Sequence, residues 1–364
     1  MSGSTFGTIF SITTWGESHG KGLGVVVDGC PAGVPLCEED IQVFLDRRKP
    51  GQSRYTTARK EGDQVEILSG IFDGKTTGTP ISMLVRNEDQ RSRDYSEIAS
   101  YYRPGHADYT FDAKYGFRDY RGGGRSSGRE TIGRVAAGAI AAKVLGEMGI
   151  SFCTYTRSIG PVTAESFDCS EIANNAVYMP DAAAAARAQQ YLETCMSQKN
   201  SAGGVIECRI NHVPAGIGDP VFNKLDANLA KAMMSIGAVK GVEIGDGFAV
   251  TQSNGLENND EFFYDEDHQL QKRTNHAGGI LGGISDGNEI ILRAAVKPTA
   301  SISSTQHTVN KTGENIEINI KGRHDPVIVP RAVVVVESMA AITLLDSMLM
   351  GMGAKMENLI KIYS

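Results

Sequence analysis

The sequence predicts an α+β protein whose sheets are largely antiparallel. Several short segments alternate apolar and polar residues, as half-buried strands do. Longer segments place apolar residues at helical spacing between them. Of the 364 residues, 41% are hydrophobic and 22% are charged, which is typical of a soluble globular chain and too apolar for a disordered one.

The strand signal is of two kinds. Two segments, 24–28 and 80–85, are continuously apolar and are expected to be buried strands. Four others alternate between apolar and polar side chains, and these are residues 64–69, 205–211, 288–294 and 315–320.

The helix signal is strongest where apolar residues recur every three or four positions. A helix is expected over 38–48, and another over 130–148, which stops at Gly149. Asp181 is expected to open an alanine-rich helix that runs to about residue 198, and a fourth helix covers 222–236. Segment 331–350 is ambiguous, because its valine run favours a strand while its length favours a helix.

Charge and cysteine usage exclude several classes of protein. The formal net charge of −7 argues against nonspecific binding to nucleic acid or to an anionic membrane. The six cysteines are scattered without a C-x-x-C motif, so we expect buried thiols in a reducing compartment. No basic leader segment and no uninterrupted membrane-length apolar run is evident, so a cytoplasmic protein is expected. No two histidines have metal-ligand spacing, and no metal site is expected.

Long polar loops are the expected place for chemistry. One domain over residues 1–364 is predicted, with working loops near 47–60, 86–129, 273–288 and 297–312. Thirteen of the 20 arginines fall between Arg47 and Arg134. Arginine recognises phosphate and carboxylate through its planar fork, so these loops predict a site for a small molecule with several anionic groups. The alternative is a set of ion pairs with nearby carboxylates or an oligomer interface. If the first interpretation holds, like-charged loops should repel until an anion arrives.

Glycine-rich stretches suggest close approach of backbone to a ligand. Arg121-Gly-Gly-Gly-Arg-Ser-Ser-Gly-Arg-Glu130 directly precedes the second predicted helix, whose first N–H groups and two serine hydroxyls can hold an anion. A second cluster, 275–285, suits a flat aromatic ligand, or else is a tight turn between strands. Lys297 and the hydroxyls that follow it suit a phosphate tail.

Two histidines lie in glycine-flanked polar settings, where acid–base chemistry is plausible. They are His19 in Gly16-Glu-Ser-His-Gly20 and His106 in Arg103-Pro-Gly-His-Ala-Asp108. A structural role remains the alternative for each. A third polar cluster is Gly322-Arg-His-Asp-Pro326.

Together with Pro50-Gly-Gln-Ser-Arg-Tyr-Thr-Thr57 and Val239-Lys-Gly-Val-Glu-Ile-Gly245, these motifs closely resemble the chorismate synthase family over nearly the whole chain. The resemblance implies a β-α-β sandwich with helices packed between the sheets, assembled as a homotetramer. It implies the conversion of 5-enolpyruvylshikimate 3-phosphate to chorismate and phosphate, the last step of the shikimate pathway to aromatic amino acids. This reaction is a 1,4-anti elimination that requires reduced FMN without net redox change.

The resemblance also implies residue roles. His19 is expected to protonate the departing phosphate, His106 to govern protonation of the reduced flavin near N1, and Asp325 to work with flavin N5 in removing the C6 proton. Contacts to the anionic groups of the substrate are expected from Ser18, Arg48, Arg54 and Arg129. FMN is expected to bind Arg125, Ser126, Ser127, Gly237, Ala238, Gly287, Lys297, Pro298, Thr299, Ala300, Ser301 and Arg323.

Relatives that reduce their own flavin with NADPH are longer and carry insertions. No such segment is evident here, so a monofunctional enzyme that depends on an external flavin reductant is expected. The rival interpretations are a noncatalytic FMN- or phosphate-binding protein, an RNA-binding module that uses the arginine loops, and a true flavin oxidoreductase.

Overall fold

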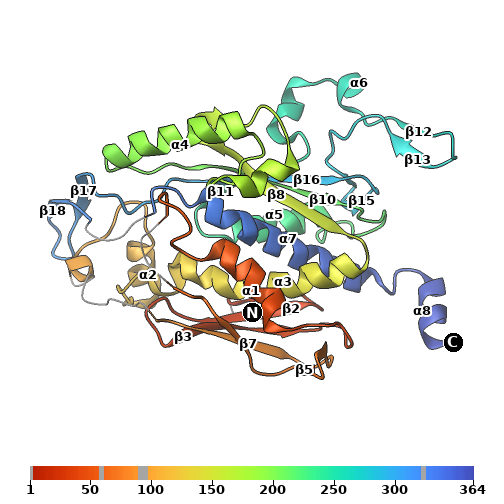
Figure 1. Ribbon diagram of the computed structural model, residues 1–364, viewed down its shortest axis with the longest axis horizontal. Coiled ribbons are helices and arrows are strands. Elements are labelled where there is room, and N and C mark those ends of the chain that lie inside the picture. The colour runs from red at the N-terminus through yellow and green to blue at the C-terminus, as the bar shows by residue number, and fades with distance from the viewer. Residues whose placement is uncertain (1–2, 57–60, 89–96, 321–324) are drawn as a thin grey trace.

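Two five-stranded sheets enclose a layer of helices in the computed structural model, which describes residues 3–56, 61–88, 97–320 and 325–364 (Figure 1). Every strand pair within the two sheets is antiparallel. The first sheet has the order β1 (Thr5–Phe6), β2 (Ser11–Gly16), β3 (Gly22–Asp28), β7 (Ile81–Arg86), β4 (Val65–Ile67). The second has the order β11 (Val239–Ile244), β16 (Ile290–Val296), β10 (Gly204–Asn211), β8 (Ser151–Ile159), β9 (Val162–Thr163).

Four helices fill the space between the sheets, and these are α1 (Glu38–Arg48), α3 (Thr131–Glu147), α5 (Leu225–Met234) and α7 (Val329–Gly351). Helix α3 lies on β3 and α7 lies on β8 and β10, while α3 and α7 pack directly on each other. One apolar cluster therefore runs from the first sheet through the helices into the second. This is the predicted α+β sandwich.

Helix α7 is apolar on all sides because it is surrounded by protein. It is the one helix in the described part of the chain that is long and apolar enough to cross a membrane, and 83% of its most apolar window is buried. Burial of that kind is typical of the central helix of a soluble protein. The ambiguity at 331–350 is resolved in favour of a helix.

The remaining elements lie outside this layered body. Helix α4 (Ala182–Ser197) lies beyond the second sheet, and α8 (Met356–Tyr363) projects from the body at the C-terminus (Figure 1). Short hairpins complete the chain: β5 (Ile71–Phe72) with β6 (Lys75–Thr76), β12 (Phe262–Tyr264) with β13 (Leu270–Lys272), β14 (Ile280–Leu281) with β15 (Ile284–Ser285), and β17 (Gln306–Val309) with β18 (Asn315–Ile318). The helix list is completed by α2 (Asp108–Tyr115) and α6 (Gly255–Asn258).

The prediction of buried thiols is only half right. Cys30, Cys195 and Cys208 are buried, but Cys37 and Cys169 are exposed. Cys153 is half-buried, because it lies on the outer face of β8, away from the helices.

Three helix ends and two polar loops converge at one end of the sandwich. Arg48 is the last residue of α1, Thr131 is the first of α3, and Arg331 lies in the first turn of α7. Helix α2 and the β17–β18 hairpin lie beside them, joined by an ion pair of 2.8 Å between Lys311 and Asp112 (Figure 1). Most of the predicted site residues lie at this end.

Candidate active site

A glycine pair brings the two predicted histidines to one loop. A Cβ atom on Gly122 would lie 2.3 Å from Cε1 and Nδ1 of His19, and a Cβ atom on Gly123 would lie 3.2 Å from Cε1 of His106. Both glycines have positive φ angles, +62° and +85°. Only glycine can adopt these φ angles and leave room for a ring at this distance. The ring of His19 therefore packs against Gly122, and the ring of His106 packs against Gly123.

His19 is buried next to groups that can share its proton. The Oγ atom of Ser18 lies 3.3 Å from Nδ1 of His19 and 3.3 Å from the carbonyl oxygen of Gly122. The pKa of Asp119 is lowered, mainly by hydrogen bonds from Arg121, and the charge of His19 contributes. A ring nitrogen of His19 lies within reach of a hydroxyl, which can orient an imidazole that acts as a general acid.

His106 is fixed by an ion pair. Arg103 donates from Nε and Nη2 to Asp108, each at 2.8 Å. Burial raises the pKa of Asp108, but hydrogen bonds from Arg103 and His106 outweigh it and hold that pKa well below its ordinary value. Nδ1 of His106 lies 3.1 Å from Nη2 of Arg103 and 3.0 Å from Oδ1 of Asp108. Nδ1 can accept a hydrogen bond from Arg103 or donate one to Asp108. In the neutral ring, the first arrangement puts the proton on Nε2 and the second leaves Nε2 without it.

A buried carboxylate joins two of the predicted substrate arginines. Asp63 accepts from Arg48 at 2.6 Å and from Arg129 at 3.0 Å. Burial raises the pKa of Asp63, but the two guanidinium groups outweigh it and lower that pKa. Arg48 also donates to the carbonyl oxygen of Gly128 at 3.2 Å. Sequence reasoning missed Asp63, because an isolated Asp in a polar loop carries no motif.

Asn87 connects this pair of arginines to the His19 loop. Its Oδ1 accepts from Nε of Arg129 at 3.0 Å. Its Nδ2 donates to the carbonyl oxygens of Glu17 and Gly20, which flank Ser18 and His19, at 3.0 and 2.9 Å. The predicted phosphate acid and a predicted anion-binding arginine are therefore held in fixed relation by one amide side chain.

Asp325 reaches the same cluster through a residue that the sequence did not single out. Nη1 of Arg331 donates to Asp325 at 2.8 Å, and Nε of Arg331 donates to the carbonyl oxygen of Arg48 at 3.0 Å. Arg331 lies in the first turn of α7, so helix packing, rather than any local motif, brings Asp325 to Arg48.

The predicted cofactor residues that lie near His106 fall into two groups, one around Lys297 and one around Ser126. Lys297 donates from its backbone N–H to Ala238 at 2.9 Å and from Nζ to the carbonyl oxygen of Gly105 at 2.8 Å. Ser126 donates to the carbonyl oxygen of Gly123 at 2.7 Å, and the Cβ position of Gly123 lies 3.2 Å from both Ser126 Oγ and His106 Cε1. The other members beside Lys297 are Gly237, Pro298, Thr299, Ala300 and Ser301.

This segment fits a ligand with a flat ring and an anionic tail. Oγ1 of Thr299 is buried and has no hydrogen-bond partner among the described residues. Nε of Arg48, at the end of α1, is also buried and without a hydrogen-bond partner among the described residues. Buried donors of this kind cost free energy unless a ligand or water binds them. Gly237 leaves open space where a side chain would stand.

Two of the predicted FMN contacts, Arg125 and Ser127, already form hydrogen bonds within the chain. The guanidinium of Arg125 is turned onto β2, where it donates to the carbonyl oxygens of Gly16 and Thr14 at 3.1 and 3.2 Å. The side chain of Ser127 accepts the N–H of Arg129 at 3.3 Å, so it caps the short turn before α3.

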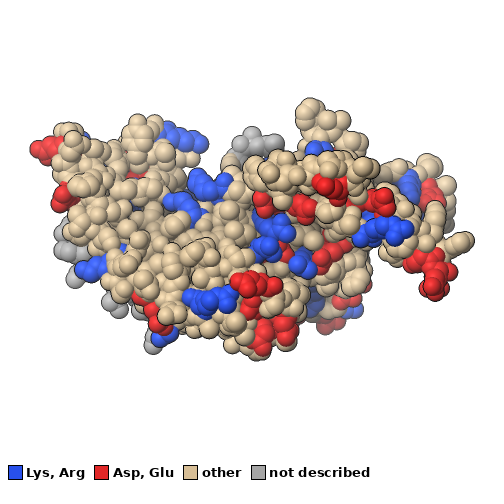
Figure 2. Space-filling model, turned by 90° about the horizontal axis from the view of Figure 1, so that it is seen from above, with Lys and Arg blue, Asp and Glu red and all other residues tan. Residues whose placement is uncertain are grey.

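In the single chain that the structure describes, Arg54 and Gly287 lie away from the group of residues around His19 and His106. Arg54 is exposed and forms an ion pair with Glu193 on α4. Figure 2 shows the side of the molecule on which α4 and α6 lie, where Lys and Arg side chains gather towards the middle. Gly287 precedes β16, while Lys297 follows that strand, so the two lie at opposite ends of it. Arg323 lies outside the described residues.

Carboxylates neutralise most of the arginine loops. Among the described residues, Arg103, Arg118, Arg121, Arg129 and Arg134 each have a carboxylate within 3.0 Å. The alternative interpretation, ion pairing within the chain, therefore accounts for much of the arginine field. These ion pairs weaken the repulsion expected between the described parts of the loops, and the response of the loops to an anion stays a prediction.

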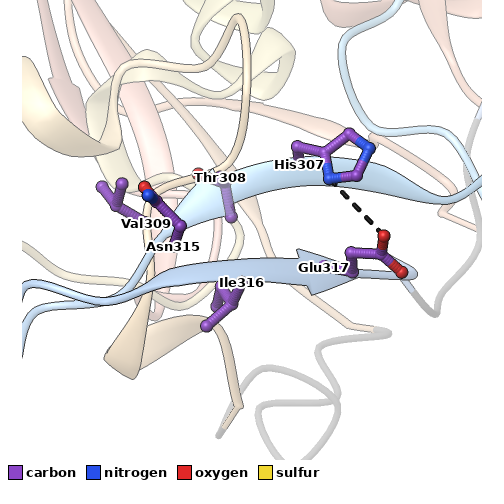
Figure 3. A pocket seen from close by; sticks show the side chains of 6 residues that line it. All are labelled: His307, Thr308, Val309, Asn315, Ile316 and Glu317. Atoms are coloured by element: carbon purple, nitrogen blue, oxygen red, sulfur yellow. Dashed lines mark ion pairs between the residues drawn. The ribbon is translucent and has the colours of Figure 1, made fainter.

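An open pocket of about 510 Å³ on the β17–β18 hairpin contains none of the predicted residues. His307 and Glu317 face each other across its two strands with an ion pair of 3.6 Å (Figure 3). Its shallow, exposed lining does not compete with the histidine–arginine cluster as a catalytic site.

The fold and this cluster define an enzyme-like site for a small molecule with several anionic groups, equipped with two histidines and a carboxylate for proton transfer. The chorismate synthase family model matches residues 10–349. The chain is 68% identical to the chorismate synthase of Agathobacter rectalis, covering 100% of this chain and 99% of that protein. It is 53% identical to the chorismate synthase of Synechocystis sp., with 95% and 97% covered. A crystal structure of chorismate synthase superposes with a TM-score of 0.78 and 33% identity, covering 98% of this chain and 96% of that one.

The chain therefore belongs to the chorismate synthase family, and the resemblance predicted from its motifs is confirmed. It is a carbon–oxygen lyase of the shikimate pathway, in which aromatic amino acids are made.

Proposed function

We propose that this chain eliminates phosphate from 5-enolpyruvylshikimate 3-phosphate to give chorismate, with reduced FMN bound beside His106. The observation that carries the proposal is the glycine pair Gly122–Gly123, which places a different histidine against each of its two residues. In the 1,4-anti elimination the bond from carbon to the phosphate oxygen breaks and a proton leaves C6. The site therefore has to supply one proton and accept another.

His19 donates a proton to the departing phosphate. A phosphate leaves readily only when its growing negative charge is neutralised, and the buried imidazole of His19 beside Ser18 suits that task. Ser18, Arg48 and Arg129 bind the anionic groups of the substrate, with Asp63 and Asn87 holding the arginines in place. Arg54, which lies apart from these residues within one chain, is the further substrate contact that the family resemblance implies.

Asp325 assists removal of the proton from C6. Its carboxylate is held by Arg331, which also bonds to the backbone of Arg48. The number of protons on the protein is unchanged after the elimination, but His19 has lost one and Asp325 has gained one. A proton therefore has to pass from Asp325 to His19, through solvent or the site, before the next turnover.

The FMN would be held by Gly237, Ala238, the segment from Lys297 to Ser301, and Arg125, Ser126 and Ser127. Gly287, which lies at the other end of β16 from Lys297 within one chain, and Arg323 are further contacts that the family resemblance implies. When bound, reduced flavin lends electron density that favours cleavage of the carbon–oxygen bond. His106 holds or releases a proton at Nε2, according to whether Nδ1 bonds to Arg103 or Asp108.

The wider proposals follow from the family resemblance. Residues 1–364 form one chorismate-synthase-like domain, and four copies form a homotetramer in the cytoplasm. The enzyme is monofunctional and receives reduced flavin from an external reductant. NADPH oxidation by the purified protein with catalytic FMN would contradict this last point.

The test is anaerobic turnover with dithionite-reduced FMN, followed by chorismate absorbance and phosphate release together. Equal amounts of both products, with many turnovers per flavin, are expected. His19→Ala is expected to lower kcat about 100-fold or more, as loss of a general acid does. The matched control is His307→Ala, an exposed histidine on β17 that should retain full activity. Full activity of the His19 variant would contradict the proposed acid, while absence of product from the folded wild type would contradict the proposed reaction.

A further inference from the structure

The first turn of α7 holds a residue that touches two parts of the candidate site at once. The guanidinium of Arg331 donates from Nη1 to Oδ2 of Asp325 at 2.8 Å and from Nε to the carbonyl oxygen of Arg48 at 3.0 Å. Arg48 ends α1, so this carbonyl is among those that have no partner within the helix. The planar guanidinium of Arg331 therefore donates hydrogen bonds both to the free carbonyl oxygen at the end of α1 and to the carboxylate of Asp325.

The geometry requires arginine. Its fixed fork can direct two N–H groups to two acceptors, whereas a lysine ammonium acts as a single point charge. The side chains of Arg331 and Asp325 are 16% and 15% exposed, so the pair is largely shielded from water. Burial lowers the pKa of Arg331, and the charge of Asp325 opposes that effect. In such surroundings, loss of one partner leaves the other charge poorly solvated.

We propose that Arg331 is a positioning residue for the elimination: it sets the orientation of the Asp325 carboxylate relative to Arg48, and so the distance between the proton acceptor and the anion-binding arginine. This inference rests on the proposed role of Asp325. Arg331 does not touch the substrate. It acts through Asp325 on proton removal, and through the backbone of Arg48 on substrate binding.

The chain offers a matched control for a purely structural role. Arg47 precedes Arg48 on α1 and donates to Glu337 on α7 at 2.7 and 2.9 Å. This bidentate pair joins the same two helices through a single carboxylate, and it contacts neither Asp325 nor the backbone of Arg48 in the described contacts. Arg47→Met should therefore lower stability without a selective effect on turnover.

The test is a double-mutant cycle on kcat, measured by anaerobic phosphate release with the variants Arg331→Met, Asp325→Asn and both together. Arg331→Met alone is expected to lower kcat about 10- to 100-fold, the loss expected for a hydrogen bond between charged groups. In the Asp325→Asn background the same change is expected to lower kcat less than about threefold, because its target is already removed. Arg331→Lys is expected to fall between wild type and Arg331→Met, and it serves if the Met variant does not fold.

The outcomes separate this inference from the proposed function. Equal losses from Arg331→Met in both backgrounds would show that Arg331 does not act through Asp325, and would overturn the inference. A parallel loss of kcat in Arg47→Met would assign the effect to helix packing and overturn it too. Full turnover by Asp325→Asn alone would instead overturn the role proposed for Asp325, on which the inference rests.

Discussion

Substitution of Gly122 by alanine tests whether the position of His19 governs the reaction. The added Cβ atom would stand 2.3 Å from Nδ1 of His19, and ordinary contact begins at 3.4 Å. The ring must therefore move by 3.4 − 2.3 = 1.1 Å, or the loop must move away from it. A displacement of about 1 Å at a reacting group costs about 100-fold in rate, so kcat should fall to about 1% of the wild-type value.

The same change also strains the backbone, and a control removes that effect. Gly122 has a φ angle of +62°, where alanine costs about 1–2 kcal/mol. Gly74 has a φ angle of +69° with no atom within 4 Å of its Cβ position. Gly74→Ala should therefore show the same strain, as a small fall in melting temperature, with unchanged kcat.

The assay is anaerobic chorismate formation at saturating substrate and reduced FMN, with thermal unfolding measured on the same samples. A folded Gly122→Ala variant that keeps kcat within about threefold of wild type would refute the reasoning. It would mean either that the loop yields freely or that the His19 ring need not stay where it lies.

Three further predictions concern acid stability, packing and oxidation. The pKa of Asp108 in the folded protein lies below its unfolded value of about 3.9, so its ion pair stabilises the fold above that pH and stops doing so as the pH falls further. When stability is measured by urea unfolding, Asp108→Asn should therefore lose less stability below about pH 4 than the wild type does. Equal losses in the two proteins would contradict this. A Cβ atom on Gly138 would lie 2.2 Å from α7, so Gly138→Ala should destabilise the protein by about 1–3 kcal/mol in urea. Gly146→Ala on the same helix meets no atom within 4 Å and should instead stabilise it by about 0.5–1 kcal/mol. The sulfur atoms of Cys153 and Cys169 lie 3.5 Å apart, so diamide should oxidise them to a disulfide, seen as loss of two hydrogens by mass spectrometry and absent from Cys169→Ser.

Periodicity predicted the elements whose buried faces are apolar. Helix α1 covers the predicted 38–48, since Ile41, Leu45 and Arg48 turn inward while Glu38 and Glu39 face water. Strand β8 was missed, although it is the longest strand described. Its buried positions include Thr154, Thr156 and Ser158, so the inward face is polar and the alternation of hydrophobicity that marks a strand is hidden.

The site divides in the same way. Glycine loops and histidines form local motifs, so His19, His106 and the 121–130 segment could be found from the sequence. Asp63 and Arg331 could not, because their importance comes from contacts with residues far away in the chain, such as Arg129 at 66 positions and Arg48 at 283. Sequence motifs therefore identify the side chains expected to contact a ligand more readily than the side chains that position those contacts.

The internal ion pairs change how anion binding by this site should be understood. Asp63 stands between Arg48 and Arg129, and its charge takes the place that a ligand anion would otherwise have to fill. The two guanidinium groups are therefore fixed before substrate arrives, so binding does not have to overcome their mutual repulsion or much of their side-chain entropy. Asp63 also weakens the net positive field that attracts the substrate. Asp63 therefore weakens the long-range attraction of the site for the substrate but fixes the two arginines in advance. Charges that are fixed in advance stabilise the phosphate anion that develops in the transition state.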